Sequence, residues 1–363
     1  MDSTINTPRS EQMVELCQFL FESAPRWSQI ADWPLESLVE CGKAGVFRWF
    51  VPEEQGGFGW CDREQTEGYL KLAEADLVTT FVITQYMGAI RRIAASENRS
   101  VAEEWLPPLM AGQAFATVGI SHLTTSRRHL SEPVLTAKKT SSGYELSGLS
   151  PWVTGAVHAD LFVVGATQED GKQVLLAVPS STKGITAKPG VELVALSASC
   201  TDQVIFDRVE VESSMVLAGP INNVLQSGVG ARTGGLQTST LAVGLATAAA
   251  KYLGAEAEKR DDLREPSRKL QDEVNGLRNT LLLACDGSAT KDAGEIRAEA
   301  NRIVLRSTQA ALMAAKGAGF VEGHPAGRWC RQALFFLVWS CPQPISHAHL
   351  CELASGAESL DFG

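Results

Sequence analysis

The chain has 363 residues, of which 44% are hydrophobic and 20% are charged, and its formal net charge is −10. A chain of this length and composition can bury a large hydrophobic core and forms one to three domains. The negative balance argues against a nucleic-acid partner, because it leaves no stripe of Lys and Arg to neutralise phosphates.

The cysteine content argues against a disulfide framework and against a metal site. There are eight cysteines, without a Cys-x-x-Cys pair or any other metal-ligand spacing, and most lie in apolar segments. Such thiols are typical of a reducing compartment, where buried cysteines act as small hydrophobic side chains. The first twelve residues are polar and no apolar run reaches 18 residues, so we expect a cytoplasmic protein that does not bind membranes.

The first third of the chain shows the periodicity of amphipathic helices. Pro34 stands where proline is favoured, at the start of a helix. The pair Pro107-Pro108 is expected to interrupt the last helix of this part, because proline removes a backbone donor. The expected helices are residues 10–23, 34 to about 42–45, 62–96 and 100–111.

A glycine-rich segment, Val51 to Trp60, separates the second and third of these helices. Its sequence VPEEQGGFGW contains three glycines in four residues, which suggests a phosphate-binding loop. No strand precedes it and no Gly-Lys-Ser/Thr follows it, so the motif is incomplete. The segment resembles a connection between early helices of the acyl-CoA dehydrogenase superfamily, and this resemblance implies a structural turn.

From about Ala114 the hydrophobic period changes from that of a helix to that of a strand, and residues 116–212 form an all-β block. Its centre is a hairpin with a Ser-Ser-Gly turn, followed by Pro151-Trp152-Val153-Thr154. In an extended segment Trp152 and Thr154 project from the same face. A flat ring beside a hydroxyl suits a planar aromatic ligand such as a flavin, although a tryptophan in a hairpin is more often packed in the core.

Helical periodicity returns after Gly219-Pro220. Helices are expected within residues 223–259, 267–286 and 295–316, and the first is rich in Ala, Gly and Ser, which permits close helix packing. These patterns divide the chain into an N-terminal helical domain, a central β-domain, a C-terminal helical bundle and a tail. Their boundaries are 1–115, 116–222, 223–355 and 356–363.

The pattern from Gly148 to Ala156, G-x-x-x-W-V-T-G-A, resembles the middle β-domain of the acyl-CoA dehydrogenase superfamily. The order of helical, β and helical segments extends the resemblance over nearly the whole chain. It implies an α+β multidomain fold ending in a four-helix bundle. It also implies bound FAD, and a homodimer or homotetramer in which each FAD is held across two subunits.

In the β-domain the resemblance implies that Trp152, Val153 and Thr154 face the flavin. The segment from Gly119 to His122 takes the place of the family's T-E-P-x-x-G-S-D loop. Ser121 replaces the Thr there and offers a hydroxyl to the flavin, whereas His122 replaces the Glu and no Gly-Ser-Asp follows. That loss puts the family's usual handling of CoA phosphates in doubt.

In the C-terminal bundle the resemblance assigns four residues to FAD. Arg260 matches the family's arginine for the diphosphate of a neighbouring subunit's FAD, and Gln271 matches the glutamine on its adenine side. Gly317 and Gly319 match a motif where backbone approaches that diphosphate. Without the resemblance, Arg260 is a solvated charge at a helix end, and the glycines cap a helix C-terminus.

The family's catalytic carboxylate is missing. The position of the Glu that removes the substrate's α-proton falls on Ser340, and the alternative position used by some members falls on Gly234. Serine needs a second base beside it before it can deprotonate a carbon acid. Cys341 as a thiolate, or His347 and His349 on the next helix, are the remaining candidates near this position.

Three functions follow from these expectations. The first is an FAD-dependent oxidoreductase of the acyl-CoA dehydrogenase class, which acts on an acyl thioester or a similar small molecule and passes electrons to an acceptor. The second is a flavin-dependent monooxygenase of the same superfamily, which receives reduced flavin from a reductase. The third is a non-catalytic relative that binds an acyl chain or a protein partner.

Overall fold

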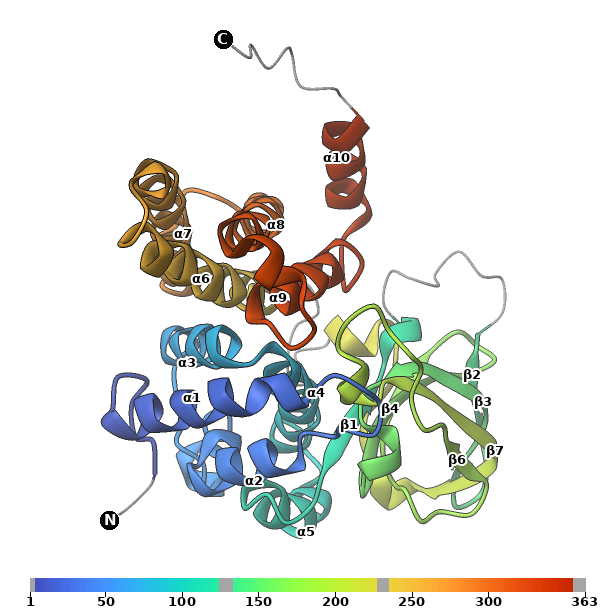
Figure 1. Cartoon of the computed structure of the whole chain (residues 1–363). Coiled ribbons are helices and arrows are strands. Elements are labelled where there is room, and N and C mark those ends of the chain that lie inside the picture. Colours follow the sequence, from blue (N-terminus) through green and yellow to red (C-terminus); the bar gives the residue numbers. More distant parts are fainter. Residues whose placement is uncertain (1–3, 124–132, 227–234, 355–363) are drawn as a thin grey trace. The chain divides into compact units, whose positions relative to one another are not determined.

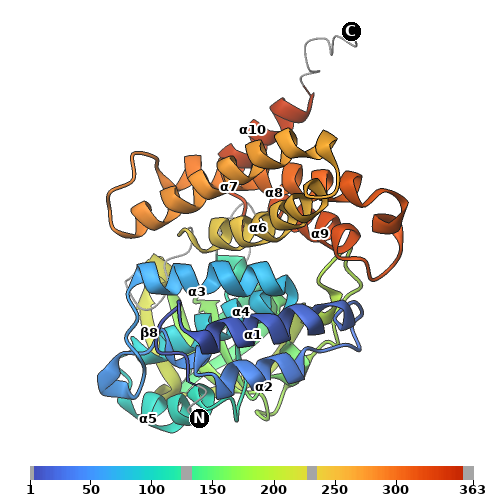
Figure 2. The ribbon, with the colours of Figure 1, turned by 60° about the vertical axis from the view of Figure 1, so that its left-hand side comes forward.

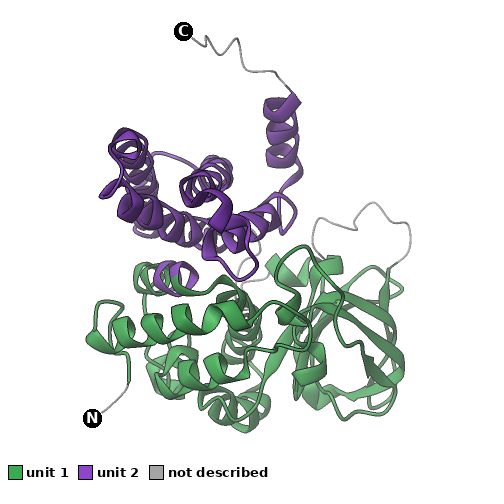
Figure 3. Ribbon diagram, viewed as in Figure 1, with its two compact units in different colours: residues 1–68, 75–233 green, residues 69–74, 234–363 purple. Residues whose placement is uncertain are grey.

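The structure is a computed structural model that describes residues 4–123, 133–226 and 235–354. It divides into two compact units (Figure 3). Unit 1 consists of residues 1–68 and 75–233, and unit 2 consists of residues 69–74 and 234–363. Among the described residues, no helix combines the length and the apolar character that a membrane span needs.

Unit 1 begins with helices, as the sequence predicts. They are α1 (Glu11–Ser23), α2 (Leu35–Lys43), α3 (Asp62–Ala75, whose residues 69–74 belong to unit 2), α4 (Leu77–Ala94) and α5 (Arg99–Met110). Ser10 caps the start of α1, and its hydroxyl accepts a hydrogen bond from the Met13 N–H. Asp76 caps the start of α4, and its carboxylate accepts from the N–H groups of Val78 and Thr79. Nearly every side chain of α4 is buried, so it forms the centre of the helical part.

Three expectations about the helical part have definite outcomes. The single helix expected over residues 62–96 is wrong, because α3 ends at Ala75 and the extended Asp76 caps the start of α4. The interruption at Pro107-Pro108 is wrong, because α5 continues through both prolines. The carbonyls that they leave without a donor belong to Glu103 and Glu104, which are exposed to water, so the loss is tolerated. The structural turn at residues 51–60 is confirmed: a Cβ on Gly57 would lie 1.8 Å from the Val51 carbonyl oxygen.

The strands gather in a separate part of unit 1 (Figure 1). They are β1 (Ala116–Gly119), β2 (Leu135–Lys139), β3 (Gly143–Val153), β4 (Leu161–Thr167), β5 (Gln173–Pro179), β6 (Ile185–Ala187), β7 (Asp202–Glu212) and β8 (Val216–Ile221). The described strands form one mixed sheet in the order β6-β7-β3-β2-β4-β5-β8, and β1 pairs in parallel with β4. The predicted hairpin is confirmed as the antiparallel pair β2–β3, with Leu135 opposite Gly148.

Unit 2 is helical, with α6 (Gln237–Ala257), α7 (Arg264–Cys285), α8 (Ala293–Ala315), α9 (Pro325–Ala333) and α10 (Gln343–Ala354). Helices α6, α7 and α8 run side by side (Figure 2). Small side chains let α6 be buried on nearly all sides. Helix α8 begins with a capping box, in which Asp292 and Glu295 satisfy each other's backbone N–H groups.

The expected order of helical, β and helical segments is confirmed. The β part begins at Ala116 and ends at Ile221, close to the proposed boundaries at 116 and 222. Both it and the N-terminal helices fall within unit 1, so a three-domain division remains a proposal about the chain. The expected tail, 356–363, lies outside the described residues.

Candidate functional site

Trp152 presents an exposed ring near the end of β3. Its side chain is 59% exposed, and its backbone φ is +56°, a left-handed value that a bulky residue rarely adopts. The pairing of β3 with β7 shifts register between Ser150 and Val153, around this residue. The ring is therefore outside the core, and the interpretation of Trp152 as a core residue is wrong.

Trp152 and Thr154 do not share a face, contrary to our expectation. Thr154 is only 2% exposed, whereas Trp152 is mostly exposed. The alternation of side chains applies to extended backbone, and the positive φ at Trp152 interrupts it. Val153 between them is fully buried in the core of the sheet, so its side chain contributes to packing.

The hydroxyl of Thr154 belongs to a buried chain of three hydroxyls. Its Oγ1 lies 3.0 Å from Oγ1 of Thr201, which lies 2.8 Å from Oγ of Ser199. The N–H of Gly155 donates to the carbonyls of Ser199 and Cys200, at 2.9 and 3.2 Å. These bonds fix the segment before β7 against the end of β3.

Ser121 lies beside the same segment. Its hydroxyl donates to the carbonyl of Pro151, the residue before Trp152, at 2.6 Å. His122 is buried, and its Nε2 atom lies 2.8 Å from the carbonyl oxygen of Gly165 in β4. The structure thus brings Ser121 close to the tryptophan segment, as the sequence predicts, and gives His122 a place inside the sheet.

In unit 2, Arg260 closes the end of a neighbouring helix. Its Nη1 donates at 2.7 Å to the carbonyl of Ala314, in the last turn of α8, where a helix carries partial negative charge. Its side chain is 25% exposed, with Asp262 at 3.7 Å from Nη2. The simple solvated charge considered from the sequence is therefore wrong, because the guanidinium has a defined partner.

The turn after α8 carries Gly317 and Gly319. The residue that ends α8 is Lys316, with φ +53°, so the expectation of a glycine cap is wrong. A Cβ on Gly317 would meet no atom within 4 Å, so its backbone faces open space. A Cβ on Gly319 would lie 2.8 Å from atoms of Leu312 and Ala315, so close packing requires glycine there. The bond from Arg260 to α8 places the guanidinium near this turn.

Gln271 lies between two helices of unit 2. Its Nε2 donates to the carbonyl of Ala250 in α6, at 3.4 Å, and to the hydroxyl of Ser267, at 3.3 Å. A Cβ on Gly254 would lie 2.4 Å from that nitrogen. The amide therefore joins α6 and α7, and its assignment to a cofactor stays a prediction.

The turn that carries Ser340 is held by a buried arginine. Arg297 of α8 is 6% exposed, and its Nη2 donates to the carbonyls of Phe336 and Trp339, at 3.0 and 2.8 Å. Its Nε donates to the side-chain oxygen of Asn301 at 2.9 Å. Burial lowers the pKa of Arg297 to about 10, so the group keeps its charge at neutral pH. Ser340 itself is exposed and has φ +45°.

No carboxylate accompanies Ser340 along the chain, since there is no Asp or Glu between Glu322 and Glu352. The Sγ of Cys341 is half-buried, 4.0 Å from Nδ2 of Asn301. On α10, His347 is exposed and lies 3.7 Å from the thiol of Cys351, whereas His349 is buried beside Glu352. Gly234, the alternative base position, lies outside the described residues.

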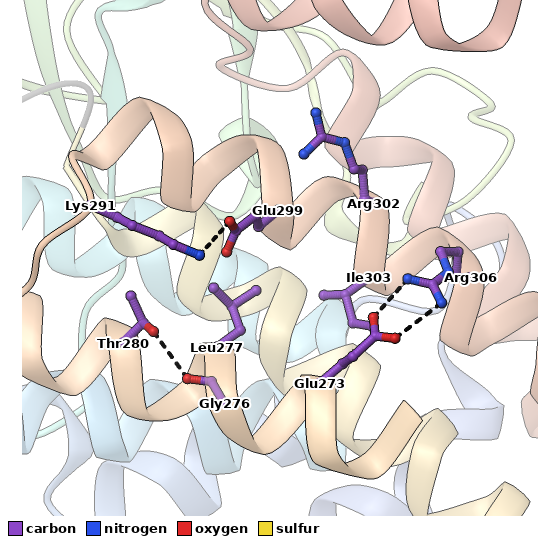
Figure 4. Close-up of a pocket in the computed structure, with 9 residues that line it drawn as sticks. All are labelled: Glu273, Gly276, Leu277, Thr280, Lys291, Glu299, Arg302, Ile303 and Arg306. Carbon is purple, nitrogen blue, oxygen red and sulfur yellow. Dashed lines mark hydrogen bonds and ion pairs between the residues drawn. The ribbon is translucent and has the colours of Figure 1, made fainter. Parts of the chain in front are cut away.

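A shallow groove of about 390 Å³ runs between α7 and α8 (Figure 4). Its floor contains Leu277 and Ile303, and charged side chains line its sides. Each of these charges is paired: Glu273 with Arg306, Lys291 with Glu299, and Arg302 with Glu352 of α10. The groove therefore offers ion pairs that stabilise the helices, and no unpaired cation among its lining residues.

Sequence reasoning missed Thr201, Ser199 and Arg297. The two hydroxyls lie about fifty residues from Thr154, in a segment without strand or helix periodicity. Arg297 falls within the periodic pattern of α8, where a charge is normally assigned to the solvent face. The helical spacing could have predicted that Arg297 is buried. It lies on the same face of α8 as the buried residues Ile296, Ala300 and Val304.

Comparisons with known proteins agree with this architecture. No family model matches the sequence. A probable acyl-CoA dehydrogenase of Bacillus subtilis is 25% identical over 332 residues, covering 84% of this chain and 86% of that protein. Butyryl-CoA dehydrogenase from Megasphaera elsdenii superposes with a TM-score of 0.80 at 18% identity, covering 94% of this chain and 97% of that one. Nitrososynthase from Micromonospora carbonacea superposes with a TM-score of 0.74 at 20% identity, covering 95% of each chain.

Proposed function

Because the chain belongs to the acyl-CoA dehydrogenase superfamily, we propose that it is a flavin-dependent oxidoreductase that binds FAD and acts on an acyl thioester or a similar substrate. The observation that carries this proposal is the exposed ring of Trp152, held in a left-handed backbone conformation. Strain of this kind persists where the surrounding structure enforces it, and it is concentrated at functional sites.

The residues of unit 1 fit the ring system of a flavin. Trp152 offers a flat apolar surface for stacking, and Thr154 offers a hydroxyl two residues away. Ser121 is fixed to the carbonyl before the tryptophan and lies beside the same segment. When bound, the flavin supplies the two-electron acceptor that none of the twenty side chains provides. The protein residues orient the ring and exclude water from one of its faces.

The residues of unit 2 fit an anionic diphosphate. Arg260 keeps about a quarter of its side chain exposed while Nη1 holds α8 and Nη2 lies 3.7 Å from Asp262, so only part of the guanidinium is left for phosphate oxygens. The open backbone at Gly317 allows close approach to a ligand. We assign Arg260, Gly317 and Gly319 to the diphosphate, and Gln271 to the adenine side of FAD.

The substrate side distinguishes this chain from a dehydrogenase with a carboxylate base. Proton abstraction from a carbon acid needs a base within hydrogen-bond reach of that carbon, and Ser340 has no ionisable group. This observation favours a second candidate, a flavin-dependent monooxygenase that obtains reduced flavin from a reductase. The structural likeness to nitrososynthase supports this candidate through the fold alone.

An absorbance spectrum of the purified protein tests the cofactor. We expect the visible bands of a flavin, either directly or after addition of FAD. Anaerobic titration with a panel of acyl-CoA thioesters then separates the reactions. Bleaching of the flavin identifies the dehydrogenase class, whereas oxygen consumption with a flavin reductase and no bleaching identifies the monooxygenase. Protein that stays colourless with added FAD contradicts both and leaves a non-catalytic binding protein.

Assembly as a homodimer or homotetramer is part of the proposal. Three apolar side chains at the end of α8 and in the following turn are largely exposed, which is costly for a monomer. They are Met313 (78%), Phe320 (88%) and Val321 (65%). Light scattering coupled to size-exclusion chromatography gives the mass directly, and a monomer at micromolar concentration would contradict this part of the proposal.

A further inference from the structure

The hydroxyls of Thr154, Thr201 and Ser199 form a continuous hydrogen-bonded chain. Thr201, just before β7, is its middle member, with Thr154 on one side and Ser199 on the other. All three side chains are nearly or fully buried, with exposures of 2% for Thr154, 5% for Thr201 and 0% for Ser199. Among the described residues, these three oxygens have no further hydrogen-bond partner.

The backbone around the chain is built to hold this arrangement. Cys200, between Ser199 and Thr201, has φ +48°, a left-handed value that side chains other than glycine seldom adopt. The N–H of Gly155 donates to the carbonyls of Ser199 and Cys200. The two segments are therefore joined by main-chain and side-chain bonds at the point where β3 ends.

The three hydroxyls have one hydrogen more than the hydrogen bonds between them can use. Three hydroxyls carry three hydrogens, and the two contacts between them use two. The remaining hydrogen must lie on one of the three oxygens, and a buried donor without an acceptor is costly. Ser199 is the most enclosed member, whereas Thr154 lies two residues from the exposed Trp152. A ligand at Trp152 is the natural source of the missing acceptor.

We propose that Thr201 and Ser199 are positioning residues for the flavin, with Ser199 donating to Thr201 and Thr201 donating to Thr154. The hydroxyl hydrogen of Thr154 is then directed outward to an acceptor nitrogen or carbonyl oxygen of the ring. This inference rests on the proposed function, because it requires a flavin beside Trp152. It explains why Thr154 is buried and yet retains a hydrogen to donate.

A double-mutant cycle on FAD binding tests the inference. The variants are Thr201→Val, Thr154→Ala and their combination, with Thr201→Ser as the matched control that keeps the hydroxyl. FAD is titrated into each apoprotein, and the dissociation constant and the visible spectrum of the bound flavin are measured. We expect Thr201→Val to raise the dissociation constant about tenfold and to shift the visible bands, as loss of one oriented hydrogen bond predicts. Thr201→Ser stays within about twofold of the parent.

The cycle separates positioning from simple packing. If Thr201 acts through Thr154, adding Thr201→Val to the Thr154→Ala protein changes the dissociation constant less than about twofold. Equal effects in both backgrounds, or an unchanged spectrum, overturn the inference. Should Thr201→Val fail to fold, Ser199→Ala at the far end takes its place, with an expected increase of about threefold. A parent protein that binds no FAD removes the proposed function and the inference together, whereas additive effects in a protein that binds FAD remove the inference alone.

Discussion

Arg297 donates from Nη2 to the main-chain carbonyl of Trp339 at 2.8 Å, immediately before the exposed Ser340. A buried guanidinium thus fixes the backbone of the turn that carries the family's base position. It has no carboxylate among its hydrogen-bond partners in the described structure, which are two carbonyls and the amide of Asn301. A charged donor therefore satisfies two main-chain carbonyls of this turn.

Arg297→Met is expected to destabilise unit 2. The substitution leaves buried carbonyl oxygens without donors, so the free energy of unfolding should fall by about 2–3 kcal/mol. Chemical denaturation measures this change. The matched control is Arg302→Met on the same helix, which breaks the exposed pair with Glu352 and should cost at most about 1 kcal/mol. Equal losses in both variants would show that Arg297 does not hold the turn.

The variants Trp152→Gly and Trp152→Ala separate two effects of this residue: the effect of its ring on FAD affinity, and the effect of its positive φ on stability. Both remove the stacking surface, so both should weaken FAD binding, by about tenfold for a lost aromatic contact. Glycine adopts positive φ without strain, so the apoprotein of Trp152→Gly should be more stable than that of Trp152→Ala by about 1 kcal/mol. Thermal unfolding of the two apoproteins gives the difference, and the exposed Val194→Ala serves as the binding control. FAD affinity unchanged by the loss of the ring would place the flavin elsewhere.

Ser340→Glu tests whether the missing carboxylate limits dehydrogenation. If the substrate lies at this turn, a carboxylate there supplies the base, and acyl-CoA should bleach the bound flavin faster than in the parent by about 10²-fold or more. Ser340→Gln is the isosteric control without charge and should stay at the parent's rate. Stopped-flow absorbance at the flavin band measures both. Identical traces for Glu and Gln would mean that the reacting carbon is out of reach of this position.

Alkylation of the native protein should label the cysteines unequally. Burial raises the pKa of Cys41 far above its ordinary value and that of Cys200 to about 11, so both remain thiols at pH 8 and lack access to reagent. Cys61 and Cys351 are exposed and should react first. Mass spectrometry after brief iodoacetamide treatment reports the order, and denatured protein gives the reference. Early labelling of Cys41 would contradict its burial in unit 1.

Acid should destabilise unit 1 through His158. Its ring is exposed on one side and stacks on Trp33 at 4.3 Å on the other, and this partial burial lowers the pKa of His158 below its ordinary 6.5. Below pH 6.5 the unfolded chain gains a proton more readily than the folded one, so stability falls as pH drops through this value. His158→Phe keeps the stack without the titration. The melting temperature of the parent should therefore fall more between pH 7 and pH 5.5 than that of the variant.

The sequence predicts the succession of elements because periodicity reports which faces are buried. It places α1, α8 and the β2–β3 hairpin well, since each has a strong pattern and clear end signals. It fails at Pro107-Pro108, where the unpaired carbonyls reach water and a helix tolerates two prolines. It also fails at the Trp152–Thr154 pair. The left-handed backbone of Trp152 interrupts the alternation of side chains along the strand, and no local sequence rule predicts that conformation for a tryptophan.

The candidate site is predictable only in part, for a physical reason. Trp152, Thr154 and Ser121 lie in segments that local pattern brings together around β3. Thr201 and Arg297 act through contacts with residues about forty to fifty positions away, and hydrogen-bond direction leaves no periodic trace in a sequence. Their roles emerge from which carbonyls and hydroxyls are left to satisfy after the elements pack.

The six residues 69–74 belong with the C-terminal helices although they lie in α3. Gly244 of α6 permits this, because a Cβ there would lie 2.7 Å from both the Ala73 side chain and the Leu70 carbonyl. A fragment starting at residue 234 would therefore lack part of its own interior and leave an apolar stripe of α6 facing water. Anyone dividing the gene for separate expression should expect that piece to aggregate.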